Sequence, residues 1–295
     1  MAQSLVIGLV QGGTYGLIAL GLVLAYRGSR VLNFAQAEIG TASLFIAWIV
    51  SGAWHKPYWM GALAAIAAAL VIGLVFERLV VRPMADAPRL SVAVATIGLF
   101  GLLVALEAYL NGPTPRYLPV PIGGLGPNIA GVYVSWTQLL TFAVIAVIAA
   151  GLTLFLRYTD FGLGVMAASE DSTAARLVGV PLSRVSMFTW GAAAVLSALA
   201  ALLIEPTITL IAPNGIGIRL FICGLAAALL GGMTSLVGAF IGGLVVGVLT
   251  AEAAYLAPQG FNGAFTVVLF VIVMAVLLLR PQGLLGKAAA RAETA

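Results

Sequence analysis

Charged residues are scarce in this chain and are confined to short clusters between long apolar stretches. Its 295 residues include 14 Lys and Arg and 10 Asp and Glu, while 62% are hydrophobic. Apart from Lys56, Arg116 and Arg219, the basic residues form four groups: Arg27 and Arg30; Arg78, Arg82 and Arg89; Arg157, Arg176 and Arg184; Arg280, Lys287 and Arg291. Apolar stretches of bilayer length with positive charge at alternate ends predict a polytopic membrane protein.

The composition argues against several other classes of protein. A soluble chain of this length needs far more than 8% charged residues. The net charge of +4 is spread over separate clusters, so we expect no nucleic-acid partner. Cys223 is the single cysteine, and we expect no disulfide, no metal site and no cofactor. The glycine-containing segment at 283–287 lacks the spacing and the Ser or Thr of a Walker A loop, so we expect no enzyme.

The apolar stretches and their flanking charges predict the number and direction of the membrane segments. They cover residues 4–26, 39–53, 59–76, 90–110, 137–156, 187–211, 220–256 and 265–279. The stretch 220–256 is too long for one span and is expected to turn at residues 231–235. We predict one all-α transmembrane domain over 1–295, with eight or nine segments, some of them broken or re-entrant. The basic clusters place the N-terminus outside and the C-terminus in the cytoplasm, with an exterior loop at 111–136 and a cytoplasmic loop at 157–186.

Glycines recur at a spacing of four in several of these stretches. They are Gly8, Gly12 and Gly16 on one predicted helix face, Gly238 with Gly242, and Gly243 with Gly247. Glycine faces let helix backbones approach closely, which in lipid is a main source of helix association. We therefore predict tight helix packing at these positions or contact with a partner subunit.

Two hydrophobic segments, one in each half of the chain, are interrupted by polar residues. The first, 28–40, contains Asn33, Gln36 and Glu38, and the second, 231–243, contains Thr234 and Ser235. Interrupted segments in corresponding positions of two halves indicate a transport pathway, because the freed backbone groups must line a cavity or be buried in protein.

Three acidic residues fall within or near predicted spans, namely Glu107, Glu205 and Glu252. An intramembrane acid is costly, so a functional role is one hypothesis. The alternative is that each acid reaches the membrane interface, because each lies close to the exterior end of its span.

Six segments together resemble one known family. They read VLNFAQAE at 31–38, ERLVVRPM at 77–84, TIG at 96–98, GLGVMAASEDSTAARLVGV at 162–180, GGMTSLVGA at 231–239 and RPQGLLG at 280–286. In this order, over nearly the whole chain, they resemble the permease subunits of ABC importers for branched-chain amino acids. The chain looks like the smaller of the two permease subunits in such systems.

The resemblance implies two sets of functional residues. Segment 162–180 is similar to the cytoplasmic coupling loop of the family, which docks on a peripheral ATPase. The coupling residues would be Ala168, Glu170, Asp171, Ala175, Arg176 and Gly179. The translocation pathway would include Asn33, Phe34, Gln36, Glu38, Thr96, Gly98, Thr234 and Ser235.

The resemblance also implies partners and a location. The expected partners are a second permease subunit, two cytoplasmic ATPase subunits, an external solute-binding protein and membrane lipid, in the inner (plasma) membrane. Branched-chain or related amino acids are the expected solutes, with small amides or urea as an alternative. Two other classes remain open: a secondary transporter driven by an ion gradient, which needs a buried ion site at the midplane, and a scaffold or passive channel.

Three positions depart from the family pattern. Met166 stands where the coupling loop usually has arginine, Gln36-Ala37 replaces His-Gly, and Thr234 replaces a glycine. The first removes or moves a charged contact to the ATPase, and the other two alter polar details of the pathway.

Overall fold

The computed structural model describes residues 2–112, 114–118, 124, 126–129, 132–208, 211–212, 215–258, 263–280 and 282–285. Its helices, in chain order, are α1 (Ala2–Ser29), α2 (Gln36–Trp48), η1 (Ile49–Ala53), α3 (Tyr58–Phe76), η2 (Glu77–Val81), α4 (Arg89–Asn111), α5 (Trp136–Tyr158), α6 (Asp160–Glu170), α7 (Ser172–Leu177), α8 (Leu182–Ile208), α9 (Ile216–Gly231), α10 (Leu236–Leu256) and α11 (Ala264–Leu279). Two short antiparallel strands, β1 (Asn128–Ile129) and β2 (Val132–Tyr133), lie between α4 and α5. Lys287 and Arg291 lie outside the described residues.

Six helices in the described part of the chain are long and apolar enough to cross a membrane. They are Ala2–Ser29, Tyr58–Val81, Arg89–Asn111, Trp136–Tyr158, Leu182–Thr207 and Leu236–Leu256. This confirms an all-helical, multi-pass membrane protein. Eight or nine membrane segments were expected, and six helices of the described residues have the length and hydropathy of a full crossing. Of the rest, α2 has 13 residues and α9 and α11 have 16 each. A straight crossing needs roughly 20 residues, which is why these three do not qualify by length.

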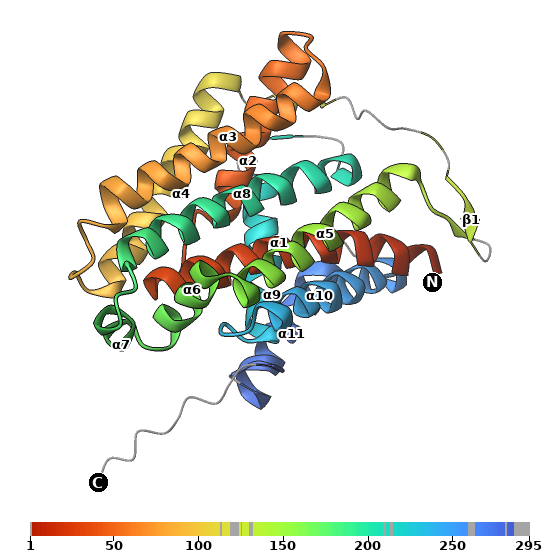
Figure 1. The fold of residues 1–295 in the computed structure, drawn as a ribbon. Helices are drawn as coiled ribbons and strands as arrows, with labels where there is room; N and C mark the ends of the chain where they lie inside the picture. Colours follow the sequence, from red (N-terminus) through yellow and green to blue (C-terminus); the bar gives the residue numbers. More distant parts are fainter. Residues whose placement is uncertain are drawn as a thin grey trace.

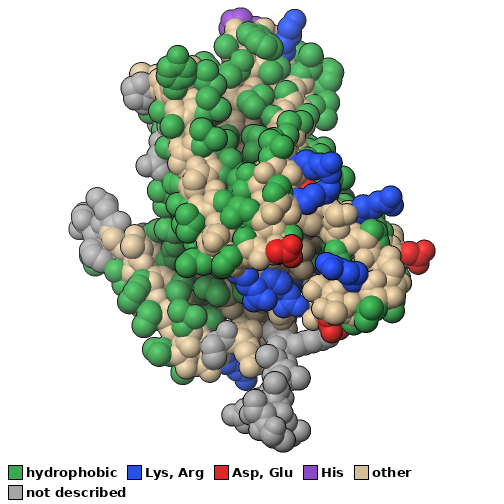
Figure 2. Space-filling view, turned by 90° about the vertical axis from the view of Figure 1, so that its left-hand side faces the viewer, with side chains coloured by type: hydrophobic (Ala, Val, Ile, Leu, Met, Phe, Trp, Pro, Cys, Tyr) green, Lys and Arg blue, Asp and Glu red, His purple; other side chains and the backbone are tan. Residues whose placement is uncertain are grey.

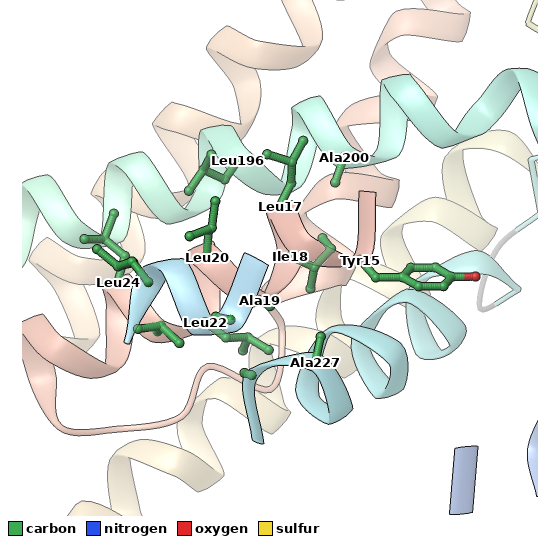
Figure 3. Close-up of a cluster of buried hydrophobic side chains, with 14 of the residues drawn as sticks. Tyr15, Leu17, Ile18, Ala19, Leu20, Leu22, Leu24, Leu196, Ala200 and Ala227 are labelled. Carbon is green, nitrogen blue, oxygen red and sulfur yellow. The ribbon is translucent and has the colours of Figure 1, made fainter. Parts of the chain in front are cut away.

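Helix α1 forms the centre of the bundle, with α8 and α10 packed along it (Figure 1). All residues from Gly12 to Ala25 are buried, so α1 has no lipid-facing side over these turns. A helix that is apolar on every face is stable only when protein or lipid surrounds it completely. Figure 3 shows Leu17, Ile18, Leu20 and Leu24 of α1 pointing to different sides, toward neighbouring helices.

The glycine faces explain how closely α1 and α10 approach. A Cβ added at Gly12 would lie 2.8 Å from the carbonyl oxygen of Gly243 and 2.8 Å from the Cα of Leu244. At Gly8 it would lie 2.8 Å from the Cα of Val248. These are backbone atoms, which cannot rotate away, so the two helices are in direct backbone contact. The predicted tight packing is confirmed for this pair.

The two interrupted segments have different structures. After α1, Arg30 adopts a positive φ of 57°, and the chain runs without helix to the start of α2 at Gln36. The second interruption is a tight turn between two antiparallel helices, where Gly232 has a φ of 98°. The hydroxyl of Ser235 then caps α10 by accepting a hydrogen bond of 3.0 Å from the amide of Gly238. The predicted turn at 231–235 is confirmed.

Candidate translocation and coupling sites

A buried polar cluster joins the first interruption to α8. The side chain of Gln36 donates hydrogen bonds of 2.8 Å to the carbonyl of Ala193 and 2.8 Å to the hydroxyl of Ser197. The Ser197 hydroxyl in turn donates to the Gln36 carbonyl, and the Asn33 amide donates to the Gln36 side-chain oxygen at 3.1 Å. Gln36 and Ser197 are fully buried. Because every polar group here has a partner, the cluster holds the break in one arrangement.

Phe34 and Thr96 lie beside this cluster. The Phe34 amide donates a hydrogen bond of 3.1 Å to the Thr96 hydroxyl, so a side chain of α4 satisfies a backbone group left free by the break. The Phe34 ring is tilted against Phe221 of α9, with ring centroids 5.6 Å apart. Gly98 is exposed on α4 and has no atom within 4 Å of an added Cβ. The structure therefore brings Thr96, but not Gly98, to the interrupted segment.

Three carboxyl groups lie inside the protein. Glu38, Glu107 and Glu205 are buried, and their carboxyl oxygens have no hydrogen-bond partner among the described residues. The carboxyls of Glu38 on α2 and Glu107 on α4 lie close enough to repel each other when both are charged. Gly217 of α9 packs directly on the Glu38 carboxyl, where any larger side chain would overlap it.

Glu107 and Glu205 are enclosed by the protein. They are 3% and 0% exposed, and both lie near the C-terminal ends of their helices, α4 and α8. Glu252 is half-buried instead, and it accepts a hydrogen bond of 2.5 Å from Ser4. A functional role is the default hypothesis for an unpaired carboxyl within a membrane bundle.

Thr234 and Ser235 lie elsewhere, in the turn between α9 and α10. The guanidinium of Arg27, near the end of α1, donates to the Thr234 carbonyl. The structure thus separates these two predicted pathway residues from Asn33 and Gln36, and it places them next to the coupling segment.

The predicted coupling segment consists of two short capped helices. The Thr159 hydroxyl caps α6 by accepting from the Gly162 amide at 3.0 Å. The Asp171 carboxylate caps α7, accepting from Thr173 at 2.8 Å and from Ala174 at 3.0 Å. Gly179, just after α7, has a φ of 90°, a conformation that favours glycine.

The six predicted coupling residues divide into two groups. Glu170, Asp171, Arg176 and Gly179 are exposed, whereas Ala168 and Ala175 are buried in the core and anchor the two helices. Leu177 and Val178 are 84% and 79% exposed at the end of α7. They give the otherwise polar segment an apolar end. Val178 was missing from the expected set because its apolar character also suits a core position.

An arginine connects the coupling segment to the central helix. The Arg30 guanidinium donates to the carbonyls of Ser169 and, at 3.1 Å, Glu170. These carbonyls belong to the C-terminal end of α6, where a cation is favoured by the helix dipole. Sequence reasoning used Arg27 and Arg30 only for orientation. The sequence signal for this contact was two arginines three residues apart, at the end of a span and just before a break.

The geometry is that of a multi-pass helical membrane protein with a broken helix in its core and an exposed helical segment at one end. The chain belongs to the family described as branched-chain amino acid transport system / permease component, whose model matches residues 4–278.

Three named relatives show how far the similarity extends. The high-affinity branched-chain amino acid transport system permease protein BraD of Pseudomonas aeruginosa is 33% identical over 97% of this chain and 95% of its own length. The corresponding LivH protein of Salmonella typhimurium is 30% identical over the same shares. The probable permease LivH of Methanocaldococcus jannaschii is 26% identical over 92% of this chain and 88% of its own. The resemblance expected from the motifs is confirmed.

Replacing Gln36 by methionine is expected to destabilise the protein, because the buried Asn33 amide loses its acceptor and the Ser197 hydroxyl and Ala193 carbonyl lose the donor they share. Each unsatisfied buried group costs about 1–3 kcal/mol. Thermal unfolding in detergent, followed by the loss of a monodisperse gel-filtration peak, measures the effect. The control is Gln282→Met, the same change at an exposed position. Equal midpoints for the two variants would contradict a structural role for the cluster.

Proposed function

We propose that this protein is a transmembrane permease subunit of a binding-protein-dependent ABC importer for branched-chain or related amino acids. The observation that carries the proposal is the exposed coupling segment α6–α7, with its apolar end at Leu177 and Val178, in a chain that belongs to the branched-chain amino acid permease family. ATP hydrolysis would occur on partner subunits, and this chain is not itself an enzyme.

The arrangement supports an orientation with the N-terminus outside and the C-terminus in the cytoplasm of the inner membrane. Helices α6 and α7 lie at the end of the bundle opposite the N-terminus (Figure 1). That end carries Arg30, Arg157, Arg176 and Arg184, as the positive-inside rule requires of a cytoplasmic face. With α9, α11 and the α2–η1 unit as shorter crossings beside the six long ones, the chain would cross or enter the membrane nine times.

The partners would be a second permease subunit, two ATPase subunits below α6–α7, and a solute-binding protein at the 111–136 loop. Glu170, Asp171, Arg176 and Gly179 would contact the ATPase, while Ala168 and Ala175 hold the segment in the core. Movement of α6 would pass through Arg30 to residues 31–35, and from there to Asn33, Phe34 and Gln36. Glu38 and Thr96 adjoin this part of the pathway. Gly98, Thr234 and Ser235 would act outside it.

A gradient-driven secondary transporter is the second candidate, because Glu38, Glu107 and Glu205 are buried without hydrogen-bond partners among the described residues. Two of these acids lie far from the midplane along their helices. Glu107 is near the exterior end of α4 (Arg89–Asn111) and Glu205 near that of α8 (Leu182–Ile208). The exposed α6–α7 segment has no role in that mechanism, so the importer is favoured.

The test is to purify the tagged protein together with its membrane neighbours, reconstitute it in liposomes, and measure ATP hydrolysis and leucine uptake. We expect an associated ATPase whose activity rises when a leucine-loaded binding protein is added. Uptake assays with urea and small amides distinguish the alternative solutes. An ATPase-free oligomer that accumulates leucine down an ion gradient would contradict the importer.

A further inference from the structure

A cavity of about 770 Å³ opens at the end of the bundle that carries α6 and α7. Its wall includes three arginines: Arg27 and Arg30 at the end of α1, and Arg157 at the end of α5. Glu170 is the one acidic residue on this wall within the described part of the chain. Figure 2 views this end of the molecule and shows basic side chains gathered near its centre.

The three guanidinium groups differ in how many hydrogen bonds they make. Arg27 donates to the Thr234 carbonyl, and Glu170 also attracts it electrostatically. Arg30 donates to the carbonyls of Ser169 and Glu170. Each guanidinium carries five N–H donors, so both retain donors after these contacts. Arg157 makes no hydrogen bond or ion pair among the described residues. With three cations and one carboxylate, the cavity carries an excess of positive charge.

The side chains of this wall are suited to binding a phosphate group. The planar guanidinium fork matches the oxygens of a phosphate group, and several forks around one cavity give charge-assisted hydrogen bonds from different directions. The Ser235 hydroxyl on the same wall accepts from the Gly238 amide and keeps its own O–H as a further donor. The first residues of α10, Leu236 and Val237, also line the cavity, and their amides begin that helix.

We propose that this cavity is a binding site for a phosphate group, held by Arg27, Arg30 and Arg157. Two sources of phosphate can reach it. Helix α5 exposes apolar side chains such as Val147 and Leu154 along its length, so an anionic phospholipid can enter beside it with its headgroup at the level of Arg157. A soluble phosphate can enter from the aqueous side. The proposal is independent of the importer function, since it concerns the chain without its ATPase.

The experiment uses the full purified chain in a neutral detergent. Native mass spectrometry counts bound phosphatidylglycerol, with phosphatidylcholine as the uncharged comparison, and calorimetric titration measures binding of inorganic pyrophosphate. We expect one saturable site per chain for one of the two anions. Arg157→Gln is expected to weaken it by about tenfold or more, because a hydrogen bond to a charged group is lost. Thr234→Glu, which adds a carboxylate to the wall without altering an arginine, is expected to weaken it similarly.

The matched control is Arg184→Gln, which removes the same charge from the same end of the bundle but lies outside this cavity. If phosphatidylglycerol binding is saturable and the Arg184→Gln variant keeps it, the site binds a lipid headgroup. If pyrophosphate binding is saturable, the site binds a soluble phosphate. Absence of saturable binding for both, or equal losses in the Arg157 and Arg184 variants, would overturn the proposal and leave only general attraction to a basic face.

Discussion

Replacing Leu177 and Val178 together by aspartate is expected to abolish association with the ATPase and, with it, ATP-driven uptake. The two side chains are 84% and 79% exposed at the end of α7 and form the apolar centre of the proposed docking surface. Burying two aliphatic side chains contributes about 3 kcal/mol or more, which corresponds to over about a hundredfold in affinity. Co-purification of the ATPase and leucine uptake by liposomes measure the loss.

Folding is expected to be unaffected in this variant, because neither side chain contributes to the buried core. The matched control is Leu284→Asp, which changes a half-exposed leucine outside α6 and α7. Retained ATPase association in the double variant would place the docking surface elsewhere. Loss of association in the Leu284 variant as well would indicate a general effect of added negative charge on this face.

Replacing Gly12 by leucine is expected to prevent the bundle from assembling. A Cβ at this position would lie 2.8 Å from two backbone atoms of α10, and backbone atoms cannot move without separating the helices. Ordinary overpacking costs about 1–3 kcal/mol, when side chains can still adjust. Here α1 is the central helix, so its displacement disturbs the contacts with α8 and α9 too. The yield of monodisperse protein after detergent extraction measures the result.

The control for this change is Gly101→Leu on α4, where an added Cβ meets no atom within 4 Å. It is expected to keep the folded yield, because leucine has a higher helix propensity than glycine. A normal yield from the Gly12 variant would mean that α1 and α10 are farther apart in the membrane than their backbone contact implies.

Much of the fold follows from the linear pattern. The spans, the turn at 231–235 and the glycine contacts of α1 were all predictable, because bilayer thickness, charge placement and side-chain size each act over a few turns of helix. The number of membrane segments stays a prediction, since apolar length alone does not tell a full crossing from a short helix such as α9 held by its neighbours.

The candidate sites were only partly predictable. Asn33 and Gln36 share one buried cluster and Thr96 lies beside it, but Thr234 and Ser235 lie apart, because the second interruption is a hairpin turn at the end of the bundle. Ala168 and Ala175 were expected to face a partner, whereas they pack inward. On a short amphipathic helix, small apolar residues suit either side, and the surrounding helices decide which side is buried.

The sequence alone determined the class of protein, its family and the approximate limits of its helices, because these depend on composition and on short-range patterns. Only the tertiary structure decided which charged groups come together. Arg27, Arg30 and Arg157 share one cavity wall, and Glu38 lies with Glu107, although these residues are far apart along the chain. Their meeting depends on how the helices are packed around α1, and packing is a property of all the helices at once.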